Sequence, residues 1–131
     1  MDLQYRVAGG ARTGYLACPD TDEKLPGVLV LHGGGGLGSH AKERADMLAK
    51  SSYVAFAPDL FGHAVQGVEP AMALTASLVE DWPDLRKRCG ETLDVLKSRP
   101  EVDATRVAVI GFCFGGQAAL ELARSGVDIK A

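Results

Sequence analysis

The stretch that decides the fold of this chain is AVIGFCFGGQAAL, residues 108–120. It follows Val107 and contains an apolar run, a short turn with glycines on both sides of Cys113, and a run rich in alanine and leucine. A strand, a sharp turn and a helix in this order are typical of a nucleophile elbow, here with cysteine where the G-x-S-x-G form has serine. The pattern predicts a strand at 107–110, a strained turn that presents Cys113, and a helix that begins at Phe114.

The glycines of this motif have a steric explanation. A nucleophile in a strained turn brings the residues two positions before and after it close together, and Gly111 and Gly115 have no Cβ atoms to collide. The turn also places the Cys113 sulfur beside the first free amides of the following helix, whose partial positive charge favours the thiolate. Cys113 is therefore the candidate catalytic residue.

The composition restricts the class of protein. A length of 131 residues and a hydrophobic content of 47% fit a single domain, 1–131, with one buried core. The net charge of -3 comes without long runs of either sign, so neither nucleic acid nor a membrane surface is expected as a partner. No apolar run approaches the roughly 18 residues of a membrane span, and the N-terminus lacks the apolar region of a signal peptide, so we expect a cytoplasmic protein. The three cysteines have unrelated spacings, and we expect no disulfide framework, metal or cofactor.

The first half of the chain predicts a hairpin followed by a βαβ unit. Short β-compatible runs at 3–7 and 14–18 are separated by glycines, as in a pair of edge strands. Residues 28–31 are continuously apolar, as in a central parallel strand that is covered on both faces. A glycine loop follows at 33–38. It leads into a helix that Ser39 can cap, and a second strand is expected at 53–57.

The second half predicts helices on either side of the elbow strand. Residues 69–79 have helical propensity without a well-defined apolar face. Asp81 is expected to cap the next helix, whose apolar residues recur at spacings of three and four and include Cys89 as a core residue. A helix from Phe114 to about Arg124 follows the elbow, and residues 128–131 approach a further strand. These elements predict an α/β fold with a mostly parallel sheet and helices on both faces.

Attack by a thiol on an acyl carbon needs donors for the oxyanion and a base or a lowered thiol pKa. The backbone N–H of Phe114, the residue after the nucleophile, is one expected donor. The second is expected from Gly33 or Gly34, where the glycine loop can turn an amide toward the sulfur. No histidine follows Cys113 in the sequence, so a base has to be sought among the three upstream histidines.

Each upstream histidine has a structural and a functional interpretation. His32 ends a strand beside the glycine loop, where it either contacts substrate or orients the loop through a hydrogen bond. His63 lies in a loop with Phe61; both are candidates to line a pocket, and the structural interpretation of His63 is a partly solvated side chain. His40 is expected at the surface, and Asp59 is expected to form a turn.

With these residues identified, the chain resembles the dienelactone hydrolase family of α/β-hydrolases. The resemblance rests on three pieces in the family's order, 28–32 with its glycine loop, 53–62 and 111–116. It implies an α/β-hydrolase-like fold and hydrolysis of carboxylic ester or lactone bonds in a small-molecule substrate. It also implies that Cys113 forms an acyl-enzyme, which water then hydrolyses.

Two departures from the family pattern affect what we expect of this chain. Family members commonly have a glutamate where this chain has Gly33. The family's triad aspartate and histidine lie in a C-terminal part that this sequence does not contain, so the chain is similar to a fold truncated before its last strands. We therefore expect weak activity, and self-association through the exposed edge of a shortened sheet.

Three alternatives stay open. Class I glutamine amidotransferases also use a glycine-flanked cysteine elbow followed by glutamine. The loop 33–38 formally contains G-x-G-x-x-G, with Asp59 about 20 residues further on, as in dinucleotide-binding modules. The third alternative is a noncatalytic chain that associates with a partner.

Overall fold

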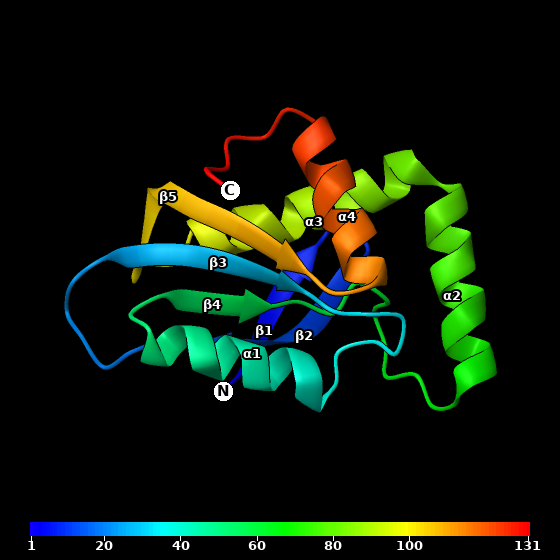
Figure 1. The fold of residues 1–131 in the computed structure, drawn as a ribbon, viewed down its shortest axis with the longest axis horizontal. Coiled ribbons are helices and arrows are strands. Elements are labelled where there is room, and N and C mark those ends of the chain that lie inside the picture. The colour runs from blue at the N-terminus through cyan, green and yellow to red at the C-terminus, as the bar shows by residue number, and fades with distance from the viewer.

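The computed structural model describes residues 1–131 as a five-stranded sheet with helices on both faces (Figure 1). The strand order is β1-β2-β4-β3-β5; β3 pairs in parallel with β4 and β5, whereas the pairs β1–β2 and β2–β4 are antiparallel. The predicted hairpin, βαβ unit and α/β fold with helices on both faces are therefore confirmed, although the sheet is mixed, with two parallel and two antiparallel pairings, rather than mostly parallel. In chain order the elements are β1 Asp2–Val7, β2 Gly10–Ala17, β3 Leu25–Leu31, α1 Ser39–Lys50, β4 Val54–Ala57, α2 Val68–Glu80, α3 Trp82–Lys97, β5 Val102–Gly111 and α4 Phe114–Arg124.

The central strand β3 is buried on both faces, as its continuous apolar sequence predicts. Val28 and Val30 belong to a cluster of small apolar residues that includes Ala41 and Ala45 of α1. Leu29 and Leu31 alternate with them and join the larger core formed with α3 and α4, which includes Cys89. Figure 1 shows α1 on one face of the sheet and α3 and α4 on the other.

Several element boundaries differ from the predictions, since β2 and β3 begin at Gly10 and Leu25 rather than at 14 and 28. Gly38, not Ser39, is the N-cap of α1, and no side chain caps this helix. The strand before the elbow begins at Val102 rather than at 107, because residues 25–26 of β3 pair with its first two residues ahead of a bulge. Residues 104–106, which make up the bulge, are exposed and include the polar Thr105 and Arg106, so the hydrophobic pattern does not reveal that they belong to a strand.

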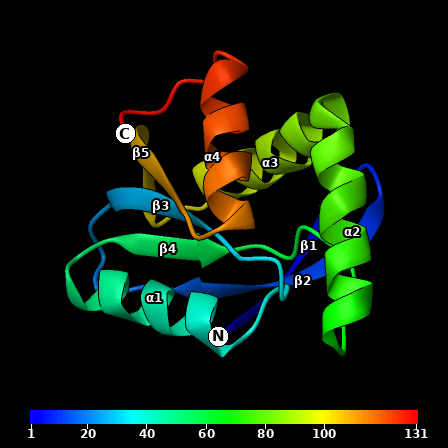
Figure 2. The same ribbon diagram turned by 45° about the vertical axis from the view of Figure 1, so that its right-hand side comes forward.

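Helix α2 stands beside the end of the sheet rather than on one of its faces (Figure 2). Ala71 and Leu78 are its only buried residues, whereas Val68 and Met72 are 73% and 65% exposed. The missing apolar face in the sequence of this helix therefore reflects its position at the margin of the core. None of the helices combines the length and the apolar character needed to cross a bilayer.

The first turn of α4 passes directly over the ends of β3 and β5. A Cβ atom on Gly115 would overlap the carbonyl groups of Leu31 and His32, and a Cβ atom on Gly111 would overlap the carbonyl of Gly115. Both glycines are therefore required by contact between backbones, which confirms the steric explanation of the motif.

Helices α3 and α4 are joined by an ion-pair cluster. The carboxylate of Glu121 on α4 is buried and accepts hydrogen bonds from Arg86 Nε of α3, at 2.8 Å, and from Arg124. These guanidinium groups, with Arg86 the stronger influence, hold the pKa of Glu121 below its ordinary value. The cluster fixes the helix that follows the elbow against its neighbour.

Gly115→Ala is expected to lower the free energy of unfolding by about 3 kcal/mol, because the added methyl group meets backbone carbonyls that have no room to move. Urea unfolding followed by circular dichroism measures this change. Gly90→Ala is the matched control: it lies within α3 with open space around the added Cβ, and alanine there should stabilise the protein by about 1 kcal/mol. An unchanged stability of Gly115→Ala would contradict the close approach.

Glu121→Gln is expected to make the free energy of unfolding less dependent on pH in the acidic range. Because the folded-state pKa of Glu121 is depressed, its contribution is complete above the unfolded-state pKa and is lost as the pH falls through the folded-state pKa. The variant should therefore be less stable than the unchanged protein at pH 7 and should lose less stability between about pH 5 and pH 3. Urea titrations at several pH values test this, with the exposed Glu69→Gln as control. Parallel pH profiles for the unchanged protein and Glu121→Gln would refute it.

Candidate active site

Cys113 occupies the turn between β5 and α4 in a strained backbone conformation. Its φ of 54° and ψ of -115° lie in a region that L residues rarely adopt, and Ser52 is the only other non-glycine residue with a positive φ. The thiol is exposed, although the next residue, Phe114, is buried. The geometry is that of the predicted elbow: the backbone turns sharply and leaves the sulfur accessible.

The exposed thiol faces a mostly apolar pocket of about 750 Å³. The pocket lies between the elbow, the glycine loop and α2, which Figure 2 shows standing opposite the start of α4. No charged or histidine side chain lines it. The lining residues are Gly34, Gly35, Val65, Gly67, Val68, Ala71, Met72, Thr75, Ala76, Val79, Cys113 and Phe114.

Backbone amides beside the thiol are free to donate. The N–H groups of Gly33, Gly34 and Phe114 make no hydrogen bond within the protein. The glycine loop also lies close to the elbow, because a Cβ atom built on Gly33 would be 3.4 Å from the Phe112 carbonyl oxygen and 3.9 Å from Cys113 Cβ. The structure therefore brings together the thiol and the amides that the sequence predicts as oxyanion donors.

His32 fixes the orientation of one of these amides. Its Nδ1–H donates to the Gly33 carbonyl at 2.7 Å, and the N–H of Gly36 donates to the same oxygen at 3.1 Å. Because the peptide bond is trans, the Gly34 N–H points opposite to that carbonyl. The ring itself is held by the Leu60 N–H, which donates to Nε2 at 3.0 Å. The Gly34 amide is thus positioned by bonds made outside the pocket.

His32 and Phe61 do not line the pocket, which corrects that expectation. His32 is 1% exposed, and burial lowers the pKa of its ring below the ordinary value, so it is neutral at pH 7. Phe61 is also buried, and its ring centroid lies 4.9 Å from that of His32 and 6.0 Å from that of Phe114. The three rings form a layer below the site. His63 lines a separate cavity of about 480 Å³ together with Asp59.

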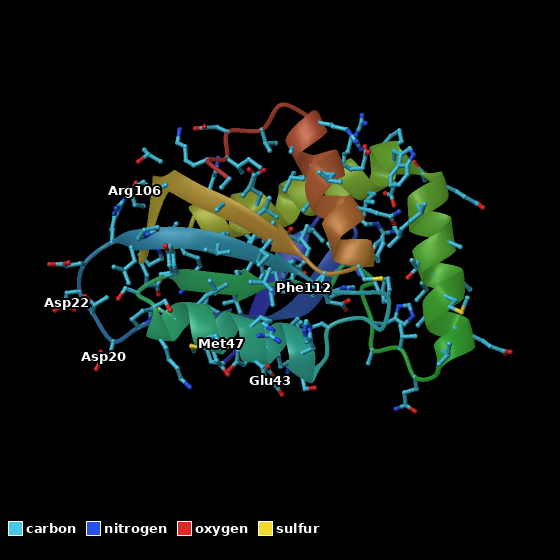
Figure 3. All side chains as sticks on the ribbon, viewed as in Figure 1. Asp20, Asp22, Glu43, Met47, Arg106 and Phe112 are labelled. Carbon is cyan, nitrogen blue, oxygen red and sulfur yellow. The ribbon has the colours of Figure 1, made fainter.

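No side chain in the structure is placed to act as a base on Cys113. The sulfur makes no hydrogen bond to any residue. Asp59 forms the predicted turn, since its carboxylate accepts the Phe61 N–H at 2.9 Å, and His40 is exposed, with its ring edge against Phe112 at a centroid distance of 4.8 Å. Phe112 is labelled in Figure 3, between the end of β5 and the start of α4. No group of three or more His, Cys, Asp or Glu residues is arranged to hold a metal ion.

One wall of the site could not be assigned from the sequence. Helix α2 supplies half of the pocket lining, including the hydroxyl-bearing Thr75. The only signal in the sequence was helical propensity at 69–79 with apolar residues around the whole helix. That pattern shows that a helix forms but does not show which side of it faces a ligand.

Comparisons with known proteins agree with the fold. A profile of the dienelactone hydrolase family matches residues 13–131. The solved structure described as m3DLH is 39% identical, with a TM-score of 0.92, and the match covers 98% of this chain and 55% of that one. A dienelactone hydrolase-like promiscuous phosphotriesterase from metagenomic libraries is 36% identical, with a TM-score of 0.94 and coverage of 99% and 55%. Protein usf of Aquifex pyrophilus is 32% identical over 132 residues, which span 97% of this chain and 56% of that protein.

The chain thus spans about half the length of the curated relatives it matches. The family match covers the glycine loop and the elbow together, and it does not favour the amidotransferase or the dinucleotide-binding alternative. The resemblance seen in the sequence is confirmed over nearly the whole chain. This chain belongs to the dienelactone hydrolase family, whose members are α/β-hydrolases.

Proposed function

We propose that Cys113 is the nucleophile of a carboxylic ester or lactone hydrolase. The sulfur attacks the carbonyl carbon, the C–O bond to the alcohol breaks, and the alcohol takes a proton and leaves. Water then attacks the resulting thioester, releasing the carboxylic acid and restoring the thiol. The observation that carries this proposal is the exposed thiol on a left-handed turn beside amides that have no acceptor.

The oxyanion formed in each step is proposed to bind to the N–H groups of Phe114 and Gly34, with Gly33 adjacent to them. One such donor typically lowers the barrier by roughly 2.7–4 kcal/mol. His32 acts as a positioning residue in this proposal, because it holds the Gly33 carbonyl and thereby the direction of the Gly34 amide.

A small neutral ester or lactone is the proposed substrate. The pocket volume falls in the range of about 300–1,000 Å³ that is usual for small-molecule sites. Its apolar walls favour hydrocarbon groups, and the absence of a charged side chain in the lining leaves no partner for an ionised substrate.

We also propose a cytoplasmic location for the protein. The three cysteines are free thiols, which supports this proposal.

Acylation and hydrolysis are expected to differ in rate. None of the three histidines lines the pocket, so residues 1–131 offer no base to activate the water that attacks the thioester. In the longer relatives, we propose that a base from outside the matched region activates the water that hydrolyses the thioester. Residues 1–131 alone should therefore accumulate the acyl-enzyme.

Incubation with p-nitrophenyl butyrate is expected to release a stoichiometric burst of p-nitrophenolate. Turnover after the burst should be slower than in an enzyme with a complete triad by about 10⁴-fold or more. Intact-mass spectrometry should show a butyryl group on Cys113, and Cys113→Ala should remove both signals, whereas Cys18→Ala should retain them. Iodoacetamide labelling of Cys113 without any ester burst would refute the proposal. A diethyl p-nitrophenyl phosphate assay and an assay for ammonia release from glutamine, run in parallel, distinguish phosphotriester and amide chemistry.

We also propose self-association along the outer edge of β5. Ile110 is 39% exposed at this edge, and residues 129–131 cover the strand only at Val107 and Val109, through hydrogen bonds of 2.8 and 2.9 Å. Light scattering at increasing protein concentration should show dimers or larger species. A monomer at all concentrations would contradict this part of the proposal.

A further inference from the structure

The glycine loop contains a peptide group that nothing in the structure holds. The N–H of Gly36 donates to the Gly33 carbonyl at 3.1 Å and closes a β-turn with Gly34 and Gly35 at its centre. The central peptide of this turn, the carbonyl of Gly34 and the N–H of Gly35, makes no hydrogen bond. Both residues line the Cys113 pocket, so this free peptide lies in the candidate site.

The turn as observed does not require glycine at its centre. Neither Gly34 nor Gly35 has a positive φ, which identifies a turn of type I. A Cβ atom on Gly35 would meet open space, and one on Gly34 would be in ordinary contact with Thr75. A type II turn differs by a rotation of the central peptide, keeps the same closing hydrogen bond, and needs a positive φ at the position of Gly35. Glycine at 35 therefore permits a second state of this loop.

Thr75 supplies a polar group beside the free peptide. Its hydroxyl oxygen is the one buried side-chain polar atom in the structure without a hydrogen-bond partner. This oxygen lies 3.4 Å from the position that a Gly34 Cβ atom would take, and no other atom beyond the adjacent residues of the loop lies within 4 Å of that position. A threonine within a helix commonly bonds to a carbonyl of the preceding turn, but Thr75 does not. Its hydroxyl is therefore available to the loop.

We propose that Thr75 is a positioning residue for the oxyanion site, an inference that rests on the proposed function. In the working state the central peptide rotates, and the Thr75 hydroxyl donates to the Gly34 carbonyl. Gly35 takes the left-handed φ of a type II turn, and its N–H turns away from α2 toward the Cys113 side of the pocket. The bond from Gly36 to Gly33 is retained, so the Gly34 amide stays in place while the Gly35 amide joins it.

The test compares two reactions of the same thiol. Acylation by p-nitrophenyl butyrate passes through an oxyanion, whereas alkylation by iodoacetamide does not, so a change in the oxyanion site alters only the first rate. Thr75→Val should lower the burst rate about tenfold and leave the alkylation rate within about twofold, whereas Thr75→Ser should restore the burst. Gly35→Ala should have the same effect, because alanine fits the observed turn but disfavours the type II turn. The double variant should be no slower than either single variant, because both changes act on one rotation.

Two controls and the thermal midpoints complete the experiment. Ser77→Ala, on the exposed side of α2, and Gly38→Ala, where an added Cβ meets open space, should leave both rates unchanged. Thr75→Val removes a hydroxyl without a partner, so its unfolding temperature should not fall; if that variant fails to fold, Gly35→Ala decides alone. Unchanged burst rates in Thr75→Val and Gly35→Ala, or equal losses in acylation and alkylation, would overturn this inference alone. Absence of a burst in the unchanged protein would overturn the proposed function as well.

Discussion

The contact of the Gly115 backbone with the carbonyl groups of Leu31 and His32 determines the shape of the candidate site. Because α4 begins directly over the end of β3, the chain has to reverse within two residues after β5, and Cys113 adopts a φ of 54°. The same contact brings the end of β3, and with it the glycine loop, next to the thiol. The strained cysteine and the nearby amides are thus two results of one steric constraint.

The Gly34 amide of the glycine loop is held in place by the hydrogen bonds of His32. His32 is buried and neutral, and it uses one ring nitrogen as donor to Gly33 and the other as acceptor from Leu60. Protonation would convert Nε2 into a donor facing another donor, so the arrangement depends on the neutral form. The hydrogen bonds of His32 therefore account for its place at the end of β3, and its buried position keeps it from acting as a base on a substrate in the pocket.

The sequence predicts the parts of this molecule that depend on local pattern. The hairpin, the β3–α1–β4 unit and the elbow each follow from apolar runs and glycines within a few residues, and the structure contains all of them. The structure confirms one of the two interpretations of His32, a hydrogen bond that orients the glycine loop. The choice between those interpretations and the burial of Phe61 could not be predicted, because both depend on which face of a strand end or loop is covered by another element. The role of Thr75 could not be predicted either. Helix α2 does not pack on a face of the sheet, so the sequence does not show which side of α2 faces the pocket.

In the proposed reaction, the chemistry of the pocket would favour the transition state over the bound substrate. Its walls are apolar and carry no charge, and its free hydrogen-bond donors next to Cys113 are backbone amides. A neutral ester gains little from such amides until negative charge develops on its carbonyl oxygen during attack by sulfur. Interactions that strengthen only at that stage raise the rate, whereas interactions that bind substrate and transition state equally do not. A charged side chain in this wall would bind ionised ligands before reaction and compete with that selectivity, so the neutral lining is itself part of how the site would act on esters.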